Sequence, residues 1–185
     1  MQEQSSAVFG RADVARLLDL PEWLLANFAD KRYPYELTPS VRGAKGRGKK
    51  GLYSLGDVYK IAVAHRLVAA GFASWVVAEA LKELFPRNSN RVEITIRDRA
   101  SMLSDSRYIL LDLSQAYWVE QGKLPDEWRT NGPQHQHWAR FVPRSFLGER
   151  WGSGTLRAAF AMPFDELLNW VDSRILGREI TFRTA

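Results

Sequence analysis

Hydrophobic residues in the first half of the chain recur at helical spacing, within short stretches that end at proline or glycine. The first stretch predicts a helix over Phe9 to Leu20, which Pro21 ends. Pro21 also opens a second helix, from Glu22 to about Lys31. Two short helices joined by a tight turn are typical of a helix-turn-helix motif, although helical hairpins also occur in ordinary protein cores.

The second of these helices has two different faces. We expect its apolar face to be buried, and this face consists of Leu24, Leu25 and Phe28. The opposite face would be exposed and carries Trp23, Ala26, Asn27 and Asp30.

Prolines and glycines crowd the segment from Tyr33 to Gly51, which predicts a loop or a strand-turn-strand wing. Leu52-Tyr53-Ser54 then predicts a short strand. Ser54 and Asp57 have the spacing of a capping box at the start of a third helix, which runs from Leu55 to about Ala70.

Gly71 ends the third helix, and a fourth follows over Ala73 to Phe85. Its apolar pairs recur at helical spacing. The polar run from Pro86 to Asn90 then predicts a domain boundary.

The second half mixes both kinds of pattern. Alternating residues predict strands at Val92–Ile96 and Arg178–Phe182, and apolar runs predict strands at Tyr108–Leu113 and Leu156–Met162. Pro163 opens a further helix to about Leu176. The sequence therefore predicts an α+β fold, with a mainly helical winged domain at residues 1–87 and a small α+β domain at residues 88–185.

Composition narrows the class of protein. The chain has 185 residues, enough for one large domain or two small ones, and contains no cysteine. Disulfides, cysteine-type zinc sites, iron–sulfur clusters and thiol nucleophiles are therefore excluded. The polar start is unlike a signal peptide, and the most apolar window, Ile61 to Leu81, is broken by charged residues. We expect a cytoplasmic protein without a membrane span.

The positive charge is concentrated in one place. The formal net charge is +5, and residues 1–90 hold 13 Lys or Arg against 9 Asp or Glu, which is +4 of that total. Seven of these cations fall within twenty residues whose only acid is Glu36: Lys31, Arg32, Arg42, Lys45, Arg47, Lys49 and Lys50. A basic, glycine-rich segment beside a helix-turn-helix can follow a DNA backbone, whereas the alternative is a solvated surface loop.

The first half resembles a MerR-type winged helix-turn-helix domain. Its first helix and turn are matched by Val14 to Leu20, its recognition helix by Leu25 and Phe28, and its wing exit by Leu52-Tyr53-Ser54 with Asp57. Its leucine-rich helix end and Gly-Phe turn are matched by Leu67 to Phe72, and the next helix by Trp75 to Leu81. The match covers about Phe9 to Leu84.

The chain departs from this family at three positions. Ala26 and Gly51 stand where the family often has an arginine, and Pro86 with a predicted strand stands where the family usually has a long subunit-pairing helix. The first two departures also fit an interaction module that no longer binds DNA.

Double-stranded DNA is the expected partner. The candidate contacts are Trp23, Asn27, Lys31, Arg32, Arg42, Lys45, Arg47, Lys49, Lys50 and Tyr53. Asn27 has the amide group for a bidentate contact with adenine, and Trp23 could press on sugar or a thymine methyl. The alternative is that Trp23 is half-buried against the wing and Asn27 is merely exposed.

The sequence gives little support for metal binding, catalysis or a cofactor. His135 and His137 lie on one side of a strand, but zinc needs three or four ligands. No catalytic residues and no cofactor are predicted. Four tryptophans could line a pocket for a small-molecule effector, although we favour a role in the core or at an interface: Trp118, Trp128, Trp138 and Trp151.

The sequence therefore predicts a DNA-binding transcriptional regulator and not an enzyme. We expect a homodimer formed through residues 91–185, by pairing of the strand edges at Val92–Ile96 and Ile180–Phe182 or by aromatic packing. Two alternatives remain: an accessory DNA binder, excisionase-like or chromosome-organising, without an inducer, and a protein-interaction module with a degenerate helix-turn-helix.

Overall fold

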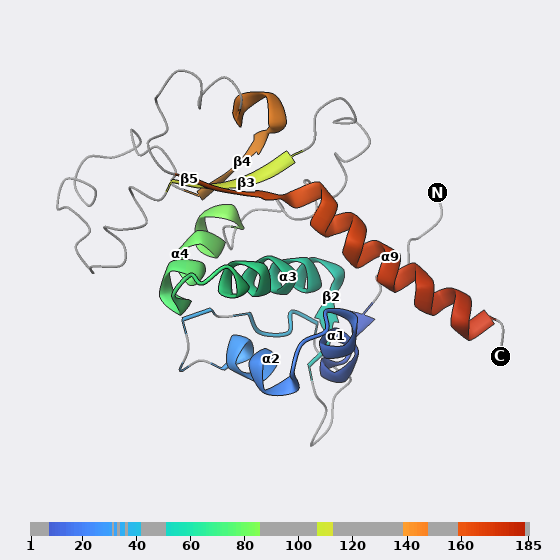
Figure 1. The fold of residues 1–185 in the computed structure, drawn as a ribbon. Coiled ribbons are helices and arrows are strands. Elements are labelled where there is room, and N and C mark those ends of the chain that lie inside the picture. The colour runs from blue at the N-terminus through green and yellow to red at the C-terminus, as the bar shows by residue number, and fades with distance from the viewer. Residues whose placement is uncertain are drawn as a thin grey trace. The chain divides into compact units, whose positions relative to one another are not determined.

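The computed structural model describes residues 8–30, 32, 34–35, 37–41, 51–85, 107–112, 139–147 and 159–183. These residues combine helices with short antiparallel strands, so the fold is α+β (Figure 1). The chain forms two compact units: the first comprises Met1–Ser74 with Leu167–Ala185, and the second comprises Trp75–Glu166. These units divide the chain after Ser74 and after Glu166. The domain boundary expected between residues 87 and 88 stays a prediction.

The first unit begins with a pair of short helices, α1 (Arg11–Leu17) and α2 (Glu22–Ala29). The turn between them is tight because Asp19 adopts a positive φ of 52° and the amide of Leu20 donates to the carbonyl of Ala15 at 2.8 Å. Aspartate tolerates this left-handed conformation better than most residues. The structure therefore has the two short helices joined by a tight turn that the sequence predicts.

Two short strands, one before and one after the helix pair, and an isolated bridge also belong to the first unit. Strand β1 (Val8–Phe9) pairs antiparallel with β2 (Tyr53–Ser54), and Val41 pairs antiparallel with Leu52 just before β2. Helix α3 (Leu55–Ala69) begins directly after β2, capped by the Ser54 side chain, which accepts from the Asp57 amide. Gly71, with a φ of 91°, ends it, as predicted.

The core of the first unit is built from the inner faces of these helices. Leu25 and Phe28 of α2 are fully buried, as predicted, but Leu24 is only half-buried. Phe28 packs edge-to-face against Tyr35, with ring centroids 4.8 Å apart. From the other end of the chain, Val171 is also fully buried.

The second unit contains helix α4 (Ser74–Leu84, from Trp75 on) and three strands: β3 (Arg107–Asp112), β4 (Ala139–Pro143) and β5 (Ala159–Pro163). The strands form an antiparallel sheet in the order β4-β3-β5. Its aromatic core joins Phe85 to Phe141 and Phe141 to Phe164. The buried Arg107 is neutralised by Asp165 at 2.6 Å.

Helix α9 (Phe164–Arg183) starts where Pro163 predicts a helix, but it does not end near Leu176. The predicted strand at Arg178–Phe182 is wrong, because this segment continues the helix past Gly177. Alternation over five residues is a weak signal, and extending an existing helix costs less than starting a new element.

Strand β3 confirms the prediction over Tyr108–Leu113, and β5 confirms the end of the one over Leu156–Met162. The predicted strand at Val92–Ile96 lies outside the described residues. Within the described part of the chain, no helix has both the length and the apolar character needed to cross a membrane.

Candidate nucleic-acid interface

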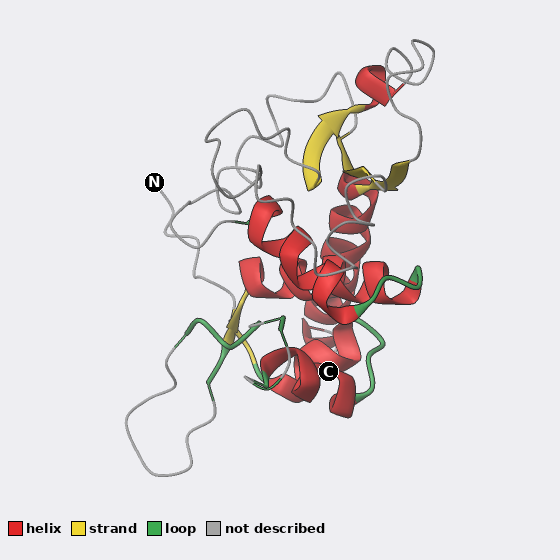
Figure 2. Cartoon of the chain, turned by 90° about the vertical axis from the view of Figure 1, so that its left-hand side faces the viewer, coloured by secondary structure: helices red, strands yellow, loops and turns green. Residues whose placement is uncertain are grey.

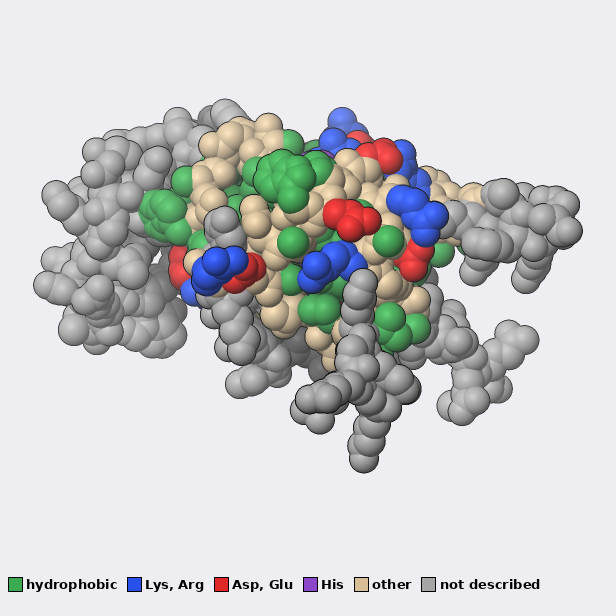
Figure 3. Space-filling view, turned by 90° about the horizontal axis from the view of Figure 1, so that it is seen from below, with side chains coloured by type: hydrophobic (Ala, Val, Ile, Leu, Met, Phe, Trp, Pro, Cys, Tyr) green, Lys and Arg blue, Asp and Glu red, His purple; other side chains and the backbone are tan. Residues whose placement is uncertain are grey.

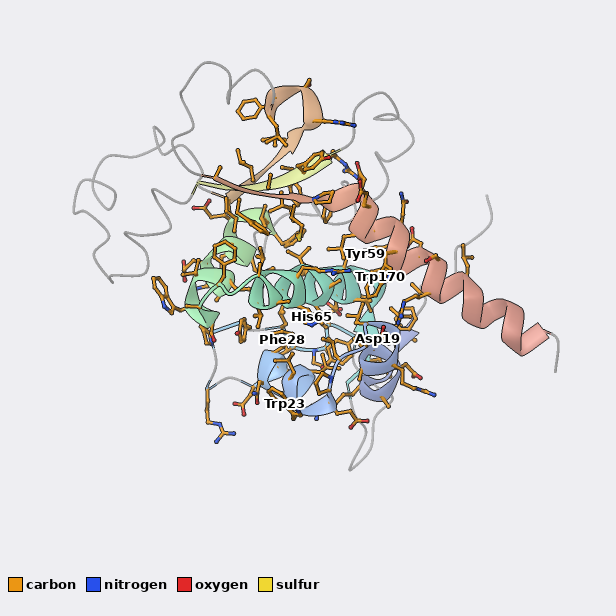
Figure 4. The ribbon with its side chains drawn as sticks, viewed as in Figure 1. Asp19, Trp23, Phe28, Tyr59, His65 and Trp170 are labelled. Atoms are coloured by element: carbon orange, nitrogen blue, oxygen red, sulfur yellow. The ribbon has the colours of Figure 1, made fainter. Side chains whose placement is uncertain are left out.

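Helix α2 presents a distinct outer face. Trp23 is 65% exposed, although it is a large apolar side chain, and it lies on the side of α2 opposite Phe28 (Figure 4). The interpretation in which Trp23 is half-buried against the wing is therefore wrong. Asn27 and Ala26 are half-buried on the same helix. An exposed indole beside an amide is a combination suited to contacting a base edge and a sugar.

The carboxylate at the end of α2 is neutralised locally. Asp30 accepts hydrogen bonds from the backbone amide of Arg32 at 2.9 Å and from its guanidinium at 2.7 Å. These bonds lower the pKa of Asp30 to about 2, so the carboxylate stays charged and paired. Arg32 remains 86% exposed, and its charge offsets an acid that would otherwise repel phosphate.

The root of the predicted wing is closed by backbone hydrogen bonds. Val41 and Leu52 exchange both of them, at 3.0 and 2.9 Å, so the two ends of the segment 42–50 are held together (Figure 2). Five of the predicted DNA contacts lie in that segment, which is outside the described residues: Arg42, Lys45, Arg47, Lys49 and Lys50. Lys31 is also outside the described residues.

At the wing root, Gly51 packs so closely against Pro39 that a side chain would not fit without movement. A Cβ atom there would lie 2.8 Å from the Cβ of Pro39, closer than side chains approach one another. A larger residue would force Pro39 to move. Close packing at the wing root therefore gives Gly51 a structural role.

Asp57 ties the wing root to α3. Its carboxylate accepts from the Ser54 amide at 2.9 Å, which completes the predicted capping box, and also from the Ser40 amide at 3.1 Å. The Ser40 hydroxyl donates to the same carboxylate. Sequence spacing could find the Ser54 bond, because it is local, but not the bonds to Ser40, which lies 17 residues away.

Tyr53 needs a different role from the one predicted. It is 1% exposed, so its side chain does not lie on the surface where DNA could contact it. Burial raises the pKa of its phenol, and the nearby Arg11 guanidinium acts against that rise. Tyr53 thus anchors β2 in the core, while the exposed Arg11 stands at the start of α1.

The described surface is not uniformly basic. Figure 3 shows hydrophobic, basic and acidic side chains next to one another on one face of the molecule. Several cations are paired with acids, including Arg16 with Asp13 at 2.6 Å. On this described face the positive charges are therefore partly balanced by neighbouring acids.

The remaining candidates can be placed only in part. The tryptophans 118, 128, 138 and 151 and both histidines of the pair at 135 and 137 lie outside the described residues. His65 is half-buried in α3, and burial followed by the charge of Arg66 lowers its pKa. Over the ranges that the structure describes, no three His, Asp or Glu side chains are grouped so that they could hold a metal ion.

Comparison with known proteins gives no further assignment, because no family model and no curated protein matches this chain.

Proposed function

We propose that this chain is a DNA-binding transcriptional regulator with a MerR-like winged helix-turn-helix head. Helix α2 would enter the major groove, and the basic segment 42–50 would lie along the phosphate backbone. The second half would dimerise or respond to a small-molecule effector. No catalytic step is part of this proposal.

One observation supports the proposal most. The tight helix pair α1–α2 and the closed root of a basic segment, the Val41–Leu52 pair, occur in the same compact unit. In that same unit, α2 carries an exposed tryptophan, Trp23, on its outer face. The exposed indole of Trp23 would be available to contact a sugar or a thymine methyl.

The segment 42–50 and helix α2 would contribute differently to DNA binding. Cations of the segment 42–50 would bind phosphates and so contribute affinity that does not depend on sequence. Asn27 and Trp23 on α2 would contribute the sequence preference, because base edges are read by amide and apolar groups in the major groove.

Binding to duplex DNA over a range of salt concentrations tests the proposal. The intact chain should bind a random-sequence duplex, with an affinity that falls linearly on a log–log plot against salt. Changing Arg42, Lys45, Arg47, Lys49 and Lys50 to Ala should flatten that slope by about 0.9 for each phosphate that the protein no longer neutralises. Lys82→Ala, which removes one cation paired with Glu79 on α4, is the control and should leave the slope unchanged.

Selection of bound sequences from random duplexes separates the alternatives. One tight palindromic site supports a regulator. Weak preference among sequences supports an accessory DNA binder. No binding at all would refute the proposed function and leave the interaction module.

A further inference from the structure

Helix α9 reaches the helix-turn-helix from the far end of the chain. Arg174 donates from its guanidinium to the carbonyl of Leu17 at 3.0 Å and forms an ion pair with the carboxylate of Asp19. Leu17 is the last residue of α1, and Asp19 is the residue with positive φ in the turn before α2. One side chain therefore holds both the end of α1 and the turn.

Both contacts are chemically well matched. The last carbonyls of a helix have no partner within the helix, and an arginine there satisfies one of them and complements the helix dipole. The hydrogen bond from Arg174 also lowers the pKa of Asp19, which keeps the carboxylate charged. The turn that contains Asp19 is thus held by the Arg174 side chain in addition to the hydrogen bond from the Leu20 amide to the Ala15 carbonyl.

The arginine itself is held in place by its neighbours. The Trp170 ring has the guanidinium of Arg174 at 4.8 Å and that of Arg66 at 5.3 Å from its centroid. Asp172 lies between Trp170 and Arg174 on α9. Its carboxylate accepts a hydrogen bond from the Tyr59 hydroxyl of α3. Figure 4 labels Asp19 in the α1–α2 turn, Tyr59 on α3 and Trp170 on α9, and the contacts above join α9 to the turn and to α3.

We infer that Arg174 is a positioning residue for DNA recognition: by clamping the α1–α2 turn, it sets the orientation of α2 relative to α1. This inference rests on the proposed function. Base contacts need α2 in one orientation, whereas phosphate contacts from the segment 42–50 do not depend on that orientation. Removal of the clamp should therefore reduce discrimination between sequences more than it reduces overall affinity.

The experiment compares the intact chain and its Arg174→Ala variant on two duplexes, one selected by the wild type and one of random sequence. Arg174→Ala should weaken binding to the selected duplex by about tenfold, because two charge-assisted bonds are removed. Binding to the random duplex should change less than about twofold, with the same salt slope.

Two milder variants keep the test decisive if Arg174→Ala folds poorly. Asp19→Asn removes the ion pair but keeps a residue that tolerates the positive φ, and Arg174→Lys keeps the charge but not the two-armed geometry. Each should lose part of the discrimination. Lys82→Ala again serves as the control for removal of one cation.

The outcomes separate the inference from the proposed function. If the wild type discriminates and all three variants discriminate equally well, the inference is overturned while the proposed function stands. If the variants lose affinity for both duplexes in equal proportion, Arg174 only stabilises the fold, and the inference is also overturned. A wild type that binds neither duplex refutes the proposed function and this inference together.

Discussion

Asp57→Ala should destabilise the first unit by about 2–3 kcal/mol. The change removes the carboxylate half of the capping box at the start of α3, the acceptor for the Ser54 amide, and a helix cap is typically worth about 0.5–2 kcal/mol. It also removes the acceptor for the Ser40 amide at 3.1 Å and for the Ser40 hydroxyl. Hydrogen bonds to a charged acceptor contribute about 1.5–3 kcal/mol when buried, and Ser40 is exposed, so we take only the lower part of that range.

Urea unfolding followed by circular dichroism measures this destabilisation, and amide hydrogen exchange at Ser40 and Ser54 localises it. Both amides should exchange faster in Asp57→Ala. Ser54→Ala should cost about 1 kcal/mol, because it removes the acceptor for the Asp57 amide and the Ser40 hydroxyl but keeps the bonds to the Asp57 carboxylate. Glu79→Ala is the matched control, since that acid is paired with Lys82 on an exposed helix face. An equal shift of the urea midpoint in Asp57→Ala and Glu79→Ala would refute the reasoning.

Three further predictions follow from the same structure. Asn27→Ala should cost about 1–3 kcal/mol at one base pair and leave binding to random DNA nearly unchanged, as measured by competition among single-site variants of the selected duplex; a uniform decrease would mean that Asn27 holds a phosphate instead. His65 should titrate below 6.5 by NMR, because burial and then Arg66 lower its pKa, so its contribution to stability is present above pH 6.5 and is lost as the pH falls below that value; a pKa above 6.5 would contradict this. The intact chain should sediment as a homodimer through residues 91–185, and a monomer at high concentration would disprove that assembly.

Three predictions that depend on neighbouring residues are confirmed. The capping box at Ser54, the end of α3 at Gly71 and the start of α9 after Pro163 are all decided within a few residues. Each depends on a backbone group that one nearby side chain caps or one residue type permits. The α+β class follows from such local signals.

The sequence failed where distant parts of the chain decide the outcome. Tyr53 is buried because it packs within the core of the first unit, which its own neighbours in sequence do not reveal. The clamp by Arg174 joins residues 157 positions apart, and no spacing rule reaches that far. Of the proposed dimer contacts, the strand edge at Ile180–Phe182 must be abandoned because it is helical, while β4 and β5 each pair only with β3 among the described strands.

Because α9 contributes to the first unit, it also determines when that unit can finish folding during synthesis. A ribosome adds about 5–20 residues each second, so the roughly 100 residues between the end of α3 and Arg174 take about 5–20 s. During that time the growing chain has α1, α2 and α3 of the first unit, but neither Val171 in the core nor Arg174 on the α1–α2 turn. The first unit is thus completed only after α9 has been translated. A transcript or chain truncated before α9 would yield a head without its clamp.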